Sequence, residues 1–394
     1  MLQLFSQNSA SIVGLAFVTA CAGAGSSGTS APPSTPVASV TAPVPQTPSA
    51  AVPSSAPTVP AAPAAATAPP FEPKKVDKHD TAMGTTVTFV AFTNARVDEA
   101  AALAAMTRAL DEIRRLEALM SEWRDDSEIG RVNAHAGEAV TVSPETLEVV
   151  EKGLWAGKMS GGVFDITFQA MSGLWKFGSA QDPTPKLPSP AAVAAAKKLV
   201  DYRKVEVSEA EHTVKLGKAQ QLGLGGIAKG FIVDRAARVL RDAGLDSFLV
   251  QAGGDLYGAG RKPDGSHWVS GIQDPRAPQG HYFATLDLDD HAFSTAGDYA
   301  RSYVVNGRRY HHIIDPRTGY PATACRSVTV WAPDAFVADA VDDAVFILGP
   351  EKGLELVASL DGVGVVIVDK KNRVVVSPRL EGRVHVLAAP TDGI

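Results

Sequence analysis

Apolar residues recur along much of this chain with the spacings of strands and helices. Residues Val87–Phe92 combine β-branched and aromatic side chains, which is typical of a strand. Residues 97–120 follow with apolar positions three and four apart, and they predict an amphipathic helix. The predicted apolar stripe consists of Leu103, Met106, Leu110, Ile113, Leu116 and Leu119.

Start and stop signals predict further helices. Ser143 precedes Pro144 and Glu145, a combination favoured at a helix N-terminus. Pro333-Asp334 predicts the start of a later helix, which ends at Gly349-Pro350. The other predicted helices cover residues 191–200, about 230–243, and 350–360.

Strand-like runs lie between these helices. Tyr202–Val207 and Thr213–Leu216 predict a hairpin. Further strands are expected at residues 248–251, 268–272, 282–288, 301–305, 327–331 and 363–368. Because strands and helices alternate irregularly, without the period of βαβ units, the predicted fold class is α+β.

The N-terminal part has a different composition. No charged side chain occurs before Glu72, and residues 22–70 are almost entirely Ala, Pro, Ser, Thr, Gly and Val. Such a segment has little apolar surface to bury, and its prolines favour extended conformations. We therefore expect residues 22–75 to form a disordered tether, followed by one large two-lobed domain over residues 76–390.

The two cysteines lead to separate expectations. Cys21 follows an apolar run, and Val18-Thr-Ala-Cys21 resembles the bacterial lipoprotein signal, although residues 1–11 contain no Lys or Arg. We expect residues 1–21 to be a signal peptide whose cysteine carries a lipid anchor; a secretory signal cleaved near Ala20 or Ala22 is the alternative. Cys325 has no partner in the body of the domain, and we expect it to be a small buried residue.

Charge argues against one class of partner. The formal net charge is −6, and no basic stripe interleaved with aromatic residues occurs. We therefore expect no binding to nucleic acid.

A glycine-rich segment precedes the helix predicted at about 230–243. Gly223, Gly225 and Gly226 allow a ligand to approach the backbone, and Lys229 stands near the helix start. Backbone N–H groups at a helix N-terminus, together with an ammonium group, suit a phosphate. The spacing is neither a Walker loop nor a dinucleotide-binding fingerprint, so a tight turn with an exposed lysine explains it equally well.

Three acids form a second candidate site. Asp339, Asp342 and Asp343 stand at i, i+3 and i+4 of the helix predicted from Asp334, so they share one face. Their neighbours are apolar, and buried carboxylates need a compensating charge, which a hard divalent cation supplies. We predict a metal role for at least Asp339; alternatively, one acid binds metal while the others cap the helix or face water.

Residues 294–319 concentrate polar side chains. Ser294–Asp298 is expected to form a turn that presents hydroxyls and a carboxylate. His311, His312 and Asp315 precede a turn at residues 316–319. A histidine is suited to general acid or base catalysis near neutral pH. The alternative is that both histidines and Asp315 are structural hydrogen-bonding residues.

The order of these motifs resembles the ApbE family of FAD:protein FMN transferases, from about Met83 to Gly349. The motifs that agree are Met83-Gly-Thr, Ser127-Glu-Ile with Asn133, Gly162-Val-Phe-Asp165, Gly225-Gly-Ile-Ala-Lys-Gly230 with Asp234, Ala252-Gly-Gly-Asp255, Ser294-Thr with Gly297-Asp-Tyr299, His312-Ile-Ile-Asp-Pro-Arg-Thr-Gly319, and Ala338-Asp339. The resemblance implies transfer of FMN from FAD to a Ser or Thr hydroxyl of a partner flavoprotein, with Mg²⁺ and release of AMP. It also implies an acceptor in a membrane redox complex and a lipoprotein on the periplasmic face of the inner membrane, which agrees with an anchor at Cys21.

The resemblance further implies roles for individual residues. FAD contacts are implied for Met83, Trp123, Val163, Phe164, Asp165, Gly223, Lys229 and Ile313. Mg²⁺ ligands are implied for the Gly226 carbonyl and for Asp339, Asp342 and Asp343. For the reaction itself we expect Lys229 to stabilise charge on the phosphates, and His312 to accept the proton in preference to Asp298.

Three positions depart from the family pattern. Trp123 stands where Tyr is usual, and an indole still stacks on a flavin or adenine ring. Gly223 replaces the usual Asp, which removes one side-chain contact to the ligand. Asp343 replaces the usual Thr, and its negative charge is expected to change metal affinity or preference.

Two other functions would use the same residues. A Mg²⁺-dependent FAD pyrophosphatase would pass FMN to water, and the sequence does not separate it from a transferase. A non-catalytic FAD-binding lipoprotein is disfavoured by the three aspartates, because storage of FAD needs no metal at the pyrophosphate.

Overall fold

The computed structural model of the chain describes residues 71–394 except 176 and 178–185. The predicted signal peptide, its Cys21 and the tether up to residue 70 lie outside the described residues. Within the described part, no helix is both long enough and apolar enough to cross a membrane. Helices and strands are mixed irregularly along the chain, as predicted for the α+β class.

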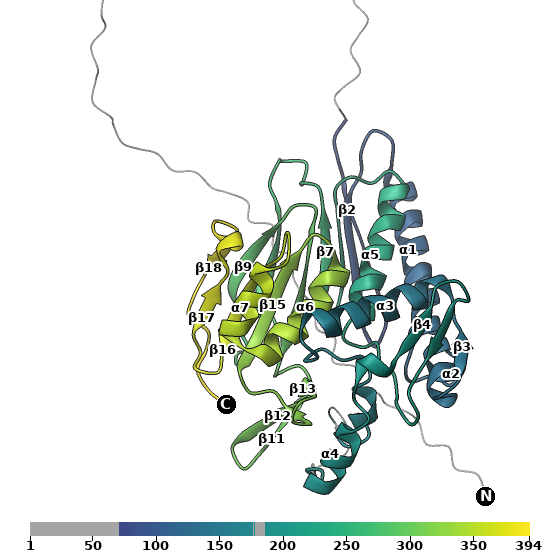
Figure 1. Ribbon diagram of the computed structural model, residues 1–394. Helices are drawn as coiled ribbons and strands as arrows, with labels where there is room; N and C mark the ends of the chain where they lie inside the picture. The colour runs from purple at the N-terminus through teal and green to yellow at the C-terminus, as the bar shows by residue number, and fades with distance from the viewer. Residues whose placement is uncertain (1–70, 176, 178–185) are drawn as a thin grey trace, which may run out of the picture. The chain divides into compact units, whose positions relative to one another are not determined.

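An antiparallel sheet of eight strands lies at the centre of the fold (Figure 1). Its strand order is β1-β2-β6-β7-β10-β15-β16-β17. The bounds are β1 Lys75–Ala82, β2 Thr85–Phe92, β6 Phe248–Ala252, β7 Asp255–Ala259, β10 His291–Gly297, β15 Cys325–Ala332, β16 Gly364–Asp369 and β17 Val374–Val376. β15 and β16 are buried along their whole length, because other layers cover both faces of the sheet.

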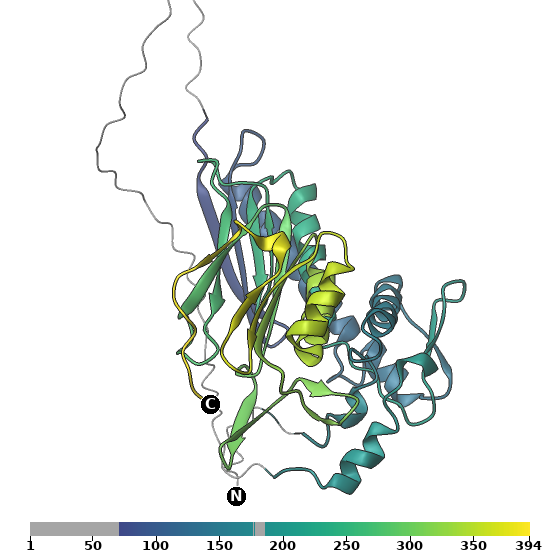
Figure 2. The ribbon, with the colours of Figure 1, turned by 60° about the vertical axis from the view of Figure 1, so that its left-hand side comes forward.

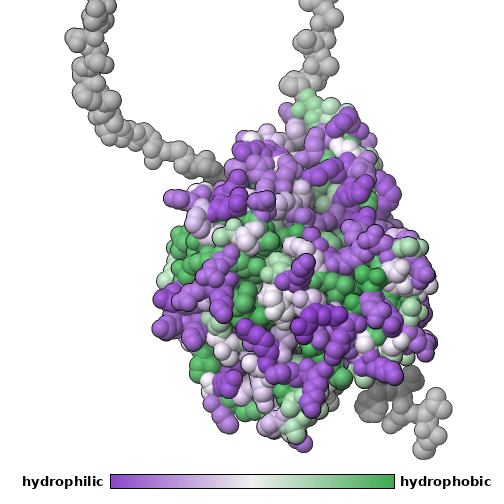
Figure 3. Space-filling model, viewed as in Figure 1, coloured by the Kyte–Doolittle hydropathy of each residue, from purple (hydrophilic) through white to green (hydrophobic). Residues whose placement is uncertain are grey.

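Helices cover one face of this sheet (Figures 1 and 2). They are α1 (Glu99–Met120), α5 (Ala228–Asp242), α6 (Ala335–Leu348) and α7 (Pro350–Ala358). α5 packs on β6 and β7, α6 packs on β10 and β15, and α1 and α6 flank α5. In the space-filling view from the same side, the surface over α6 and α7 contains hydrophobic residues interspersed with hydrophilic ones (Figure 3).

A second, three-stranded sheet of order β18-β9-β8 packs against the opposite face. Its strands are β8 Trp268–Gln273, β9 Tyr282–Leu288 and β18 Val384–Val386. Successive residues of a strand point to opposite faces, so Val250 contributes to the core under the helices while Leu249 contributes to the core between the sheets. The large sheet is therefore the middle of three layers.

Residues 128–215 and 302–321 supply smaller elements. They are α2 Glu128–Ala134, α3 Pro144–Met159, α4 Pro190–Lys197, a sheet of β3 Ala139–Thr141, β5 Thr213–Lys215 and β4 Glu206–Ser208, and the pairs β11 Ser302–Val305 with β12 Arg308–His311 and β13 Ile314–Asp315 with β14 Tyr320–Pro321. Short 3₁₀ turns cover Gln169–Met171, Tyr202–Lys204 and Pro378–Leu380. Ser143 caps α3 by accepting a hydrogen bond from the backbone N–H of Thr146, as its position predicts.

Three local predictions are wrong. Ser294–Gly297 belong to β10, which pairs with β7 and β15, and the turn begins only at Asp298. Tyr202–Lys204 form a 3₁₀ turn rather than the start of a strand. Leu103 of α1 is 40% exposed, because Ala102, Ala105 and Ala109 occupy the buried side of the helix instead.

α5 and α6 touch near their N-terminal ends. A methyl group added to Gly230 would lie 2.1 Å from the carbonyl oxygen of Ala335, so only glycine permits this approach. One turn later, the carboxylate of Asp234 accepts hydrogen bonds from the backbone N–H groups of Ala335 and Phe336, both at 2.9 Å. These contacts fix the start of α6, the helix that carries the three predicted metal-binding aspartates.

Candidate active site

Polar residues of the predicted site gather at one end of the large sheet. The turn between β6 and β7 holds Gly253, whose N–H donates to the Thr86 carbonyl of β2, so this turn lies beside the turn at Met83. A methyl group on the next residue, Gly254, would lie 3.2 Å from the carbonyl oxygen of Thr295 on β10. Asp255 begins β7 at the same end of the sheet.

A connected set of contacts surrounds the ammonium group of Lys229. Its Nζ lies 2.5 Å from Asp255 Oδ2 and 3.4 Å from Asp339 Oδ1. Asp255 is completely buried, and its other oxygen accepts a hydrogen bond from Ser294 Oγ. Ser294 Oγ also lies 2.7 Å from Asp342 Oδ2. Side chains from α5, β7, β10 and α6 are thereby joined in one network.

This network contains more acid than base. Burial raises the pKa of Asp339 to about 7 and that of Asp343 to about 6. Burial, reinforced by Asp343 and Asp339, also raises the pKa of Asp342 well above its ordinary value. Burial favours the neutral amine of Lys229, but the charges of Asp255 and Asp339 outweigh it and raise its pKa. Additional positive charge would therefore be stabilised here.

The glycine turn at residues 223–226 leads directly into α5. A methyl group on Gly226 would lie 3.0 Å from Asp343 Oδ2 and 3.4 Å from the ring of Phe164. In the first turn of α5, the backbone N–H of Gly230 donates to Asp339 Oδ2 at 2.9 Å, and that of Ala228 donates to the Leu224 carbonyl at 2.8 Å. Gly225 is exposed and Gly226 is partly exposed, so a ligand can approach the backbone of this turn beside the acids of α6.

The acids fit a hard cation only with help from a ligand. In the part of the chain that the structure describes, no three Asp, Glu, His or Cys side chains form a complete metal site. The donors are nonetheless oxygen atoms, the pKa values of all three α6 aspartates are raised, and Gly226 adjoins Asp343. Magnesium commonly takes one or two protein carboxylates and completes its coordination with substrate phosphates and water. The donor set therefore fits Mg²⁺ bound together with a phosphorylated ligand.

The structure separates the two candidate proton acceptors. His312 Nδ1 is buried and has no hydrogen-bond partner among the described residues. Burial, and next the charge of Arg301, lower the pKa of His312 to about 3, so its ring is neutral at physiological pH. Asp298 instead accepts hydrogen bonds from Arg276 on both oxygens, at 2.7 and 2.8 Å. Its carboxylate is already paired.

His311 has a structural environment. Its Nε2 lies 2.8 Å from the Ala322 carbonyl oxygen, and its Nδ1 accepts a hydrogen bond from the backbone N–H of Ile313. The ring thus holds the segment that carries Ile313, which is itself buried.

The remaining predicted FAD contacts differ in their surroundings. Met83 lies in the β1–β2 turn with a φ of 52°, and Val163 and Phe164 are buried. Asp165 is also buried, and its carboxylate accepts hydrogen bonds from the backbone N–H groups of Thr167 and Tyr202. Trp123 is 77% exposed, so its indole is accessible to a ligand or a partner.

Three residues of this region received no role from the sequence. Asp255 and Ser294 stood within motifs, but only their contacts with Lys229 and Asp342 connect them to the acids. Arg301 influences the pKa values of Glu122, His312 and Asp343, which lie far apart in the chain. No spacing rule could have joined these three.

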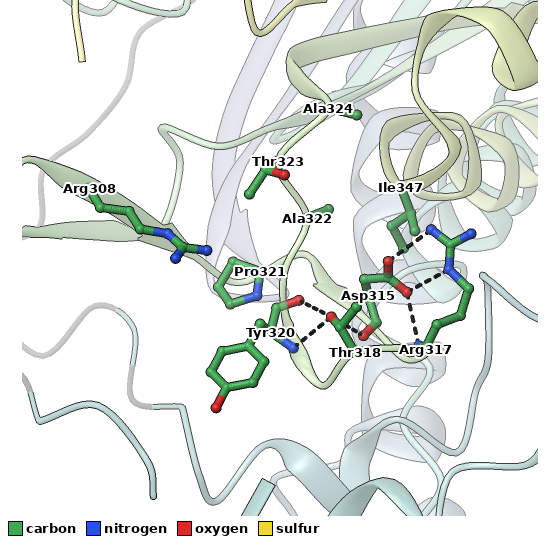
Figure 4. Close-up of a pocket in the computed structure, with 10 residues that line it drawn as sticks. All are labelled: Arg308, Asp315, Arg317, Thr318, Tyr320, Pro321, Ala322, Thr323, Ala324 and Ile347. Carbon is green, nitrogen blue, oxygen red and sulfur yellow. Dashed lines mark hydrogen bonds and ion pairs between the residues drawn. The ribbon is translucent and has the colours of Figure 1, made fainter. Parts of the chain in front are cut away.

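A pocket is lined by Ile347 and by residues between 308 and 324 (Figure 4). Its volume is about 520 Å³, and its lining includes the Arg317–Asp315 ion pair at 2.8 Å, Tyr320 and Arg308. None of the residues predicted to bind FAD or Mg²⁺ lines it. The pocket is therefore not the predicted site.

Comparisons with known proteins agree on one group. Residues 83–367 match the model of the ApbE family. A FAD:protein FMN transferase from Treponema pallidum is 35% identical over 302 residues, which cover 73% of this chain and 83% of that protein. The crystal structure of the ApbE protein from Thermotoga maritima superposes with a TM-score of 0.71 at 29% identity, over 81% of this chain and 100% of that one. The flavin transferase ApbE from Vibrio cholerae superposes with a TM-score of 0.70 at 27% identity, over 79% of this chain and 100% of that one.

Proposed function

This chain belongs to the ApbE family of flavin transferases, and we propose that it transfers FMN from FAD to a Ser or Thr hydroxyl of a partner flavoprotein. We propose further that the reaction requires Mg²⁺ and releases AMP. The observation that carries the proposal is the buried network in which Lys229 meets Asp255 and Asp339 beside the glycine turn. A network of this kind is suited to binding a pyrophosphate through a metal ion and an ammonium group.

Asp339, Asp342, Asp343 and the Gly226 carbonyl would hold the Mg²⁺. The ion, when bound, supplies positive charge that neutralises the pyrophosphate and stabilises the charge developing at phosphorus. The raised pKa values of the three aspartates support this assignment, since a cation would compensate the charges that burial disfavours.

The residues of the chain then orient the reacting groups. Lys229 adds a second positive charge at the phosphates. The acceptor oxygen forms a bond to the FMN-side phosphorus while the bond from that phosphorus to the bridging oxygen breaks. AMP leaves with the bridging oxygen, and the hydroxyl proton passes to a base.

We propose His312 as that base. Its Nδ1 has no partner among the described residues, whereas both oxygens of Asp298 are paired with Arg276. A base with a pKa of about 3 accepts a hydroxyl proton poorly, but a bound pyrophosphate would add negative charge nearby and raise that value.

Replacing His312 by Ala is expected to slow transfer by about 100-fold or more, because a positioned base typically contributes this much. The rate of covalent FMN formation at saturating FAD measures the effect. Asp298→Asn is the comparison variant: it should lower the thermal unfolding temperature by weakening the Arg276 ion pair and change the rate less. A His312→Ala protein that retains the full rate would remove the assignment.

One experiment tests the proposed reaction as a whole. The protein is incubated with FAD, Mg²⁺ and a candidate flavoprotein, and the products are analysed by mass spectrometry. Covalent FMN on the flavoprotein together with AMP supports transfer. AMP together with unattached FMN would show a pyrophosphatase instead, and unchanged FAD would show a storage protein.

The cellular setting is also a proposal. We propose that Cys21 carries a lipid anchor at the periplasmic face of the inner membrane, and that the acceptor belongs to a membrane redox complex. The proposal rests on residues 1–21 of the sequence and on the family, and incorporation of a labelled fatty acid would test it.

A further inference from the structure

The hairpin of β11 and β12 carries positive charge and no acid. Between Asp298 and Asp315 the chain contains Arg301, Arg308 and Arg309, and neither Asp nor Glu. Among the described residues, no Asp or Glu forms an ion pair with these three arginines, although other arginines in this region are paired with aspartates. Because the whole chain has a formal net charge of −6, the hairpin is a basic element on an acidic protein.

The three arginines have different surroundings. Arg309 is partly buried, and its guanidinium donates hydrogen bonds to a hydroxyl and a carbonyl oxygen of the chain, both at 2.7 Å. The Arg301 carbonyl accepts a hydrogen bond from the backbone N–H of His312 at 3.2 Å, at the base of the hairpin. Arg308 is exposed, and its guanidinium lies 5.2 Å from the centre of the Tyr310 ring. Within the described part of the chain, Arg308 thus keeps its donors available.

Arg308 extends from the hairpin toward the pocket of about 520 Å³ (Figure 4). The acid among the lining residues, Asp315, already accepts hydrogen bonds from Arg317 on both oxygens, at 2.9 and 2.8 Å. The other polar lining residues can donate hydrogen bonds: Arg317, Thr318, Tyr320 and Thr323. Apolar residues complete the lining: Pro321, Ala322, Ala324 and Ile347. The pocket therefore suits a ligand that combines apolar groups with a carboxylate.

The pocket adjoins the segment that carries the proposed base. Ala322 lines the pocket, and its carbonyl oxygen lies 2.8 Å from His311 Nε2. The backbone N–H of Ala322 donates to the Ile313 carbonyl at 3.0 Å. Arg308 and His312 are four residues apart, so the chain separates them by at most about 14 Å. A short polypeptide bound in the pocket can therefore also reach His312.

We propose that this pocket binds the polypeptide of the acceptor flavoprotein, with a carboxylate of the acceptor paired to Arg308 and the acceptor hydroxyl placed at His312. A guanidinium group binds a carboxylate through two parallel hydrogen bonds, which fixes the orientation of the bound segment. Apolar side chains of the same segment would cover the apolar lining. The inference rests on the proposed function, because the acceptor is the second substrate of that reaction.

The first test measures the KM for the flavoprotein that acquires covalent FMN. Arg308→Ala is expected to raise this KM about 10-fold, the lower end of the range for hydrogen bonds to a charged group. The FAD affinity and the kcat at saturating acceptor should stay the same. Arg308→Glu should raise the KM further, since two carboxylates would then repel each other. Arg108→Glu is the matched control, because Arg108 is an exposed arginine of α1, away from the hairpin (Figure 1). Its KM should equal that of the wild type.

The second test exchanges the charges. The acids that flank the acceptor hydroxyl in the flavoprotein are replaced by Lys one at a time. One of these replacements should lower kcat/KM with the wild-type enzyme and recover much of the lost kcat/KM with Arg308→Glu. Thr323→Glu places a carboxylate in the pocket lining, and it should raise the KM as Arg308→Ala does. If no replacement restores kcat/KM with Arg308→Glu, the proposed ion pair is wrong.

The outcomes distinguish this inference from the proposed function. If the wild type transfers FMN and Arg308→Ala and Arg308→Glu keep the wild-type KM for the acceptor, the inference alone is wrong. Weaker FAD binding by Arg308→Ala with an unchanged KM for the acceptor would also overturn it, because Arg308 would then contact FAD. A wild-type protein that releases AMP and unattached FMN and labels no flavoprotein would contradict the proposed function, and the inference with it.

Discussion

Replacing Asp339 by Asn is expected to slow FMN transfer by about 100- to 1000-fold, the usual cost of removing one group that stabilises transition-state charge. The amide has nearly the same size and can still accept the hydrogen bond from Gly230. The substitution does remove the negative charge next to Lys229, and with it a carboxylate that we propose as a ligand of Mg²⁺. AMP release and covalent FMN, measured at saturating FAD and Mg²⁺, give the rate.

Glu351→Gln is the control for this variant. Glu351 lies in the first turn of α7 and is exposed, so its replacement removes one charge close to α6 without touching the network. Thermal unfolding supplies a second measurement: added Mg²⁺ should raise the unfolding temperature of the wild type and raise that of Asp339→Asn less. A folded Asp339→Asn protein with the wild-type rate and the wild-type response to Mg²⁺ would exclude Asp339 as a ligand.

Gly230→Ala is expected to lower the free energy of unfolding by about 3 kcal/mol or more. In an ordinary helix this substitution stabilises by up to about 1 kcal/mol, because alanine has the higher helix propensity. Here the added methyl group would lie 2.1 Å from the carbonyl oxygen of Ala335 and 2.8 Å from Asp339 Cβ. Neither neighbour is the end of a flexible side chain, so the helices must separate and the overlap outweighs the gain in propensity.

Urea denaturation measures the change, and Gly173→Ala is the matched control. A methyl group on Gly173 would meet no atom within 4 Å, and the residue is exposed. The control should therefore unfold at the wild-type urea concentration. If Gly230→Ala were as stable as the control, α5 and α6 would be less closely packed than the structure indicates.

Local patterns were sufficient for most helices and several strands. The stripe of residues 97–120 and the signals at Ser143 and Asp334 predicted α1, α3 and α6 because each depends on residues within one or two turns. β10 was missed because Ser294 and Thr295 are polar, although they are satisfied inside the fold by Asp255, Asp342 and Thr329. The strand order of the large sheet depends on pairings between distant segments, which no local pattern contains.

The same distinction applies to the candidate site. Asp339, Asp342 and Asp343 could be placed on one face because helical spacing determines that arrangement. The contact between Lys229 and Asp255 joins a helix to a strand, and the contact between Glu122 and Gly223 joins two loops. Both arise only from the packing of the layers. Residue identity indicated phosphate and metal chemistry, but not which acids are neighbours.

The shared volume at Glu122 and Gly223 also restricts how this site can change over evolutionary time. A methyl group added to Gly223 would lie 2.7 Å from Glu122 Oε2, so an acid at both positions would place two carboxylates in one volume. Among related proteins we therefore expect an acid at no more than one of the two positions. A lineage that gains an acid at position 223 must first lose the one at position 122, so the two residues should be inherited together.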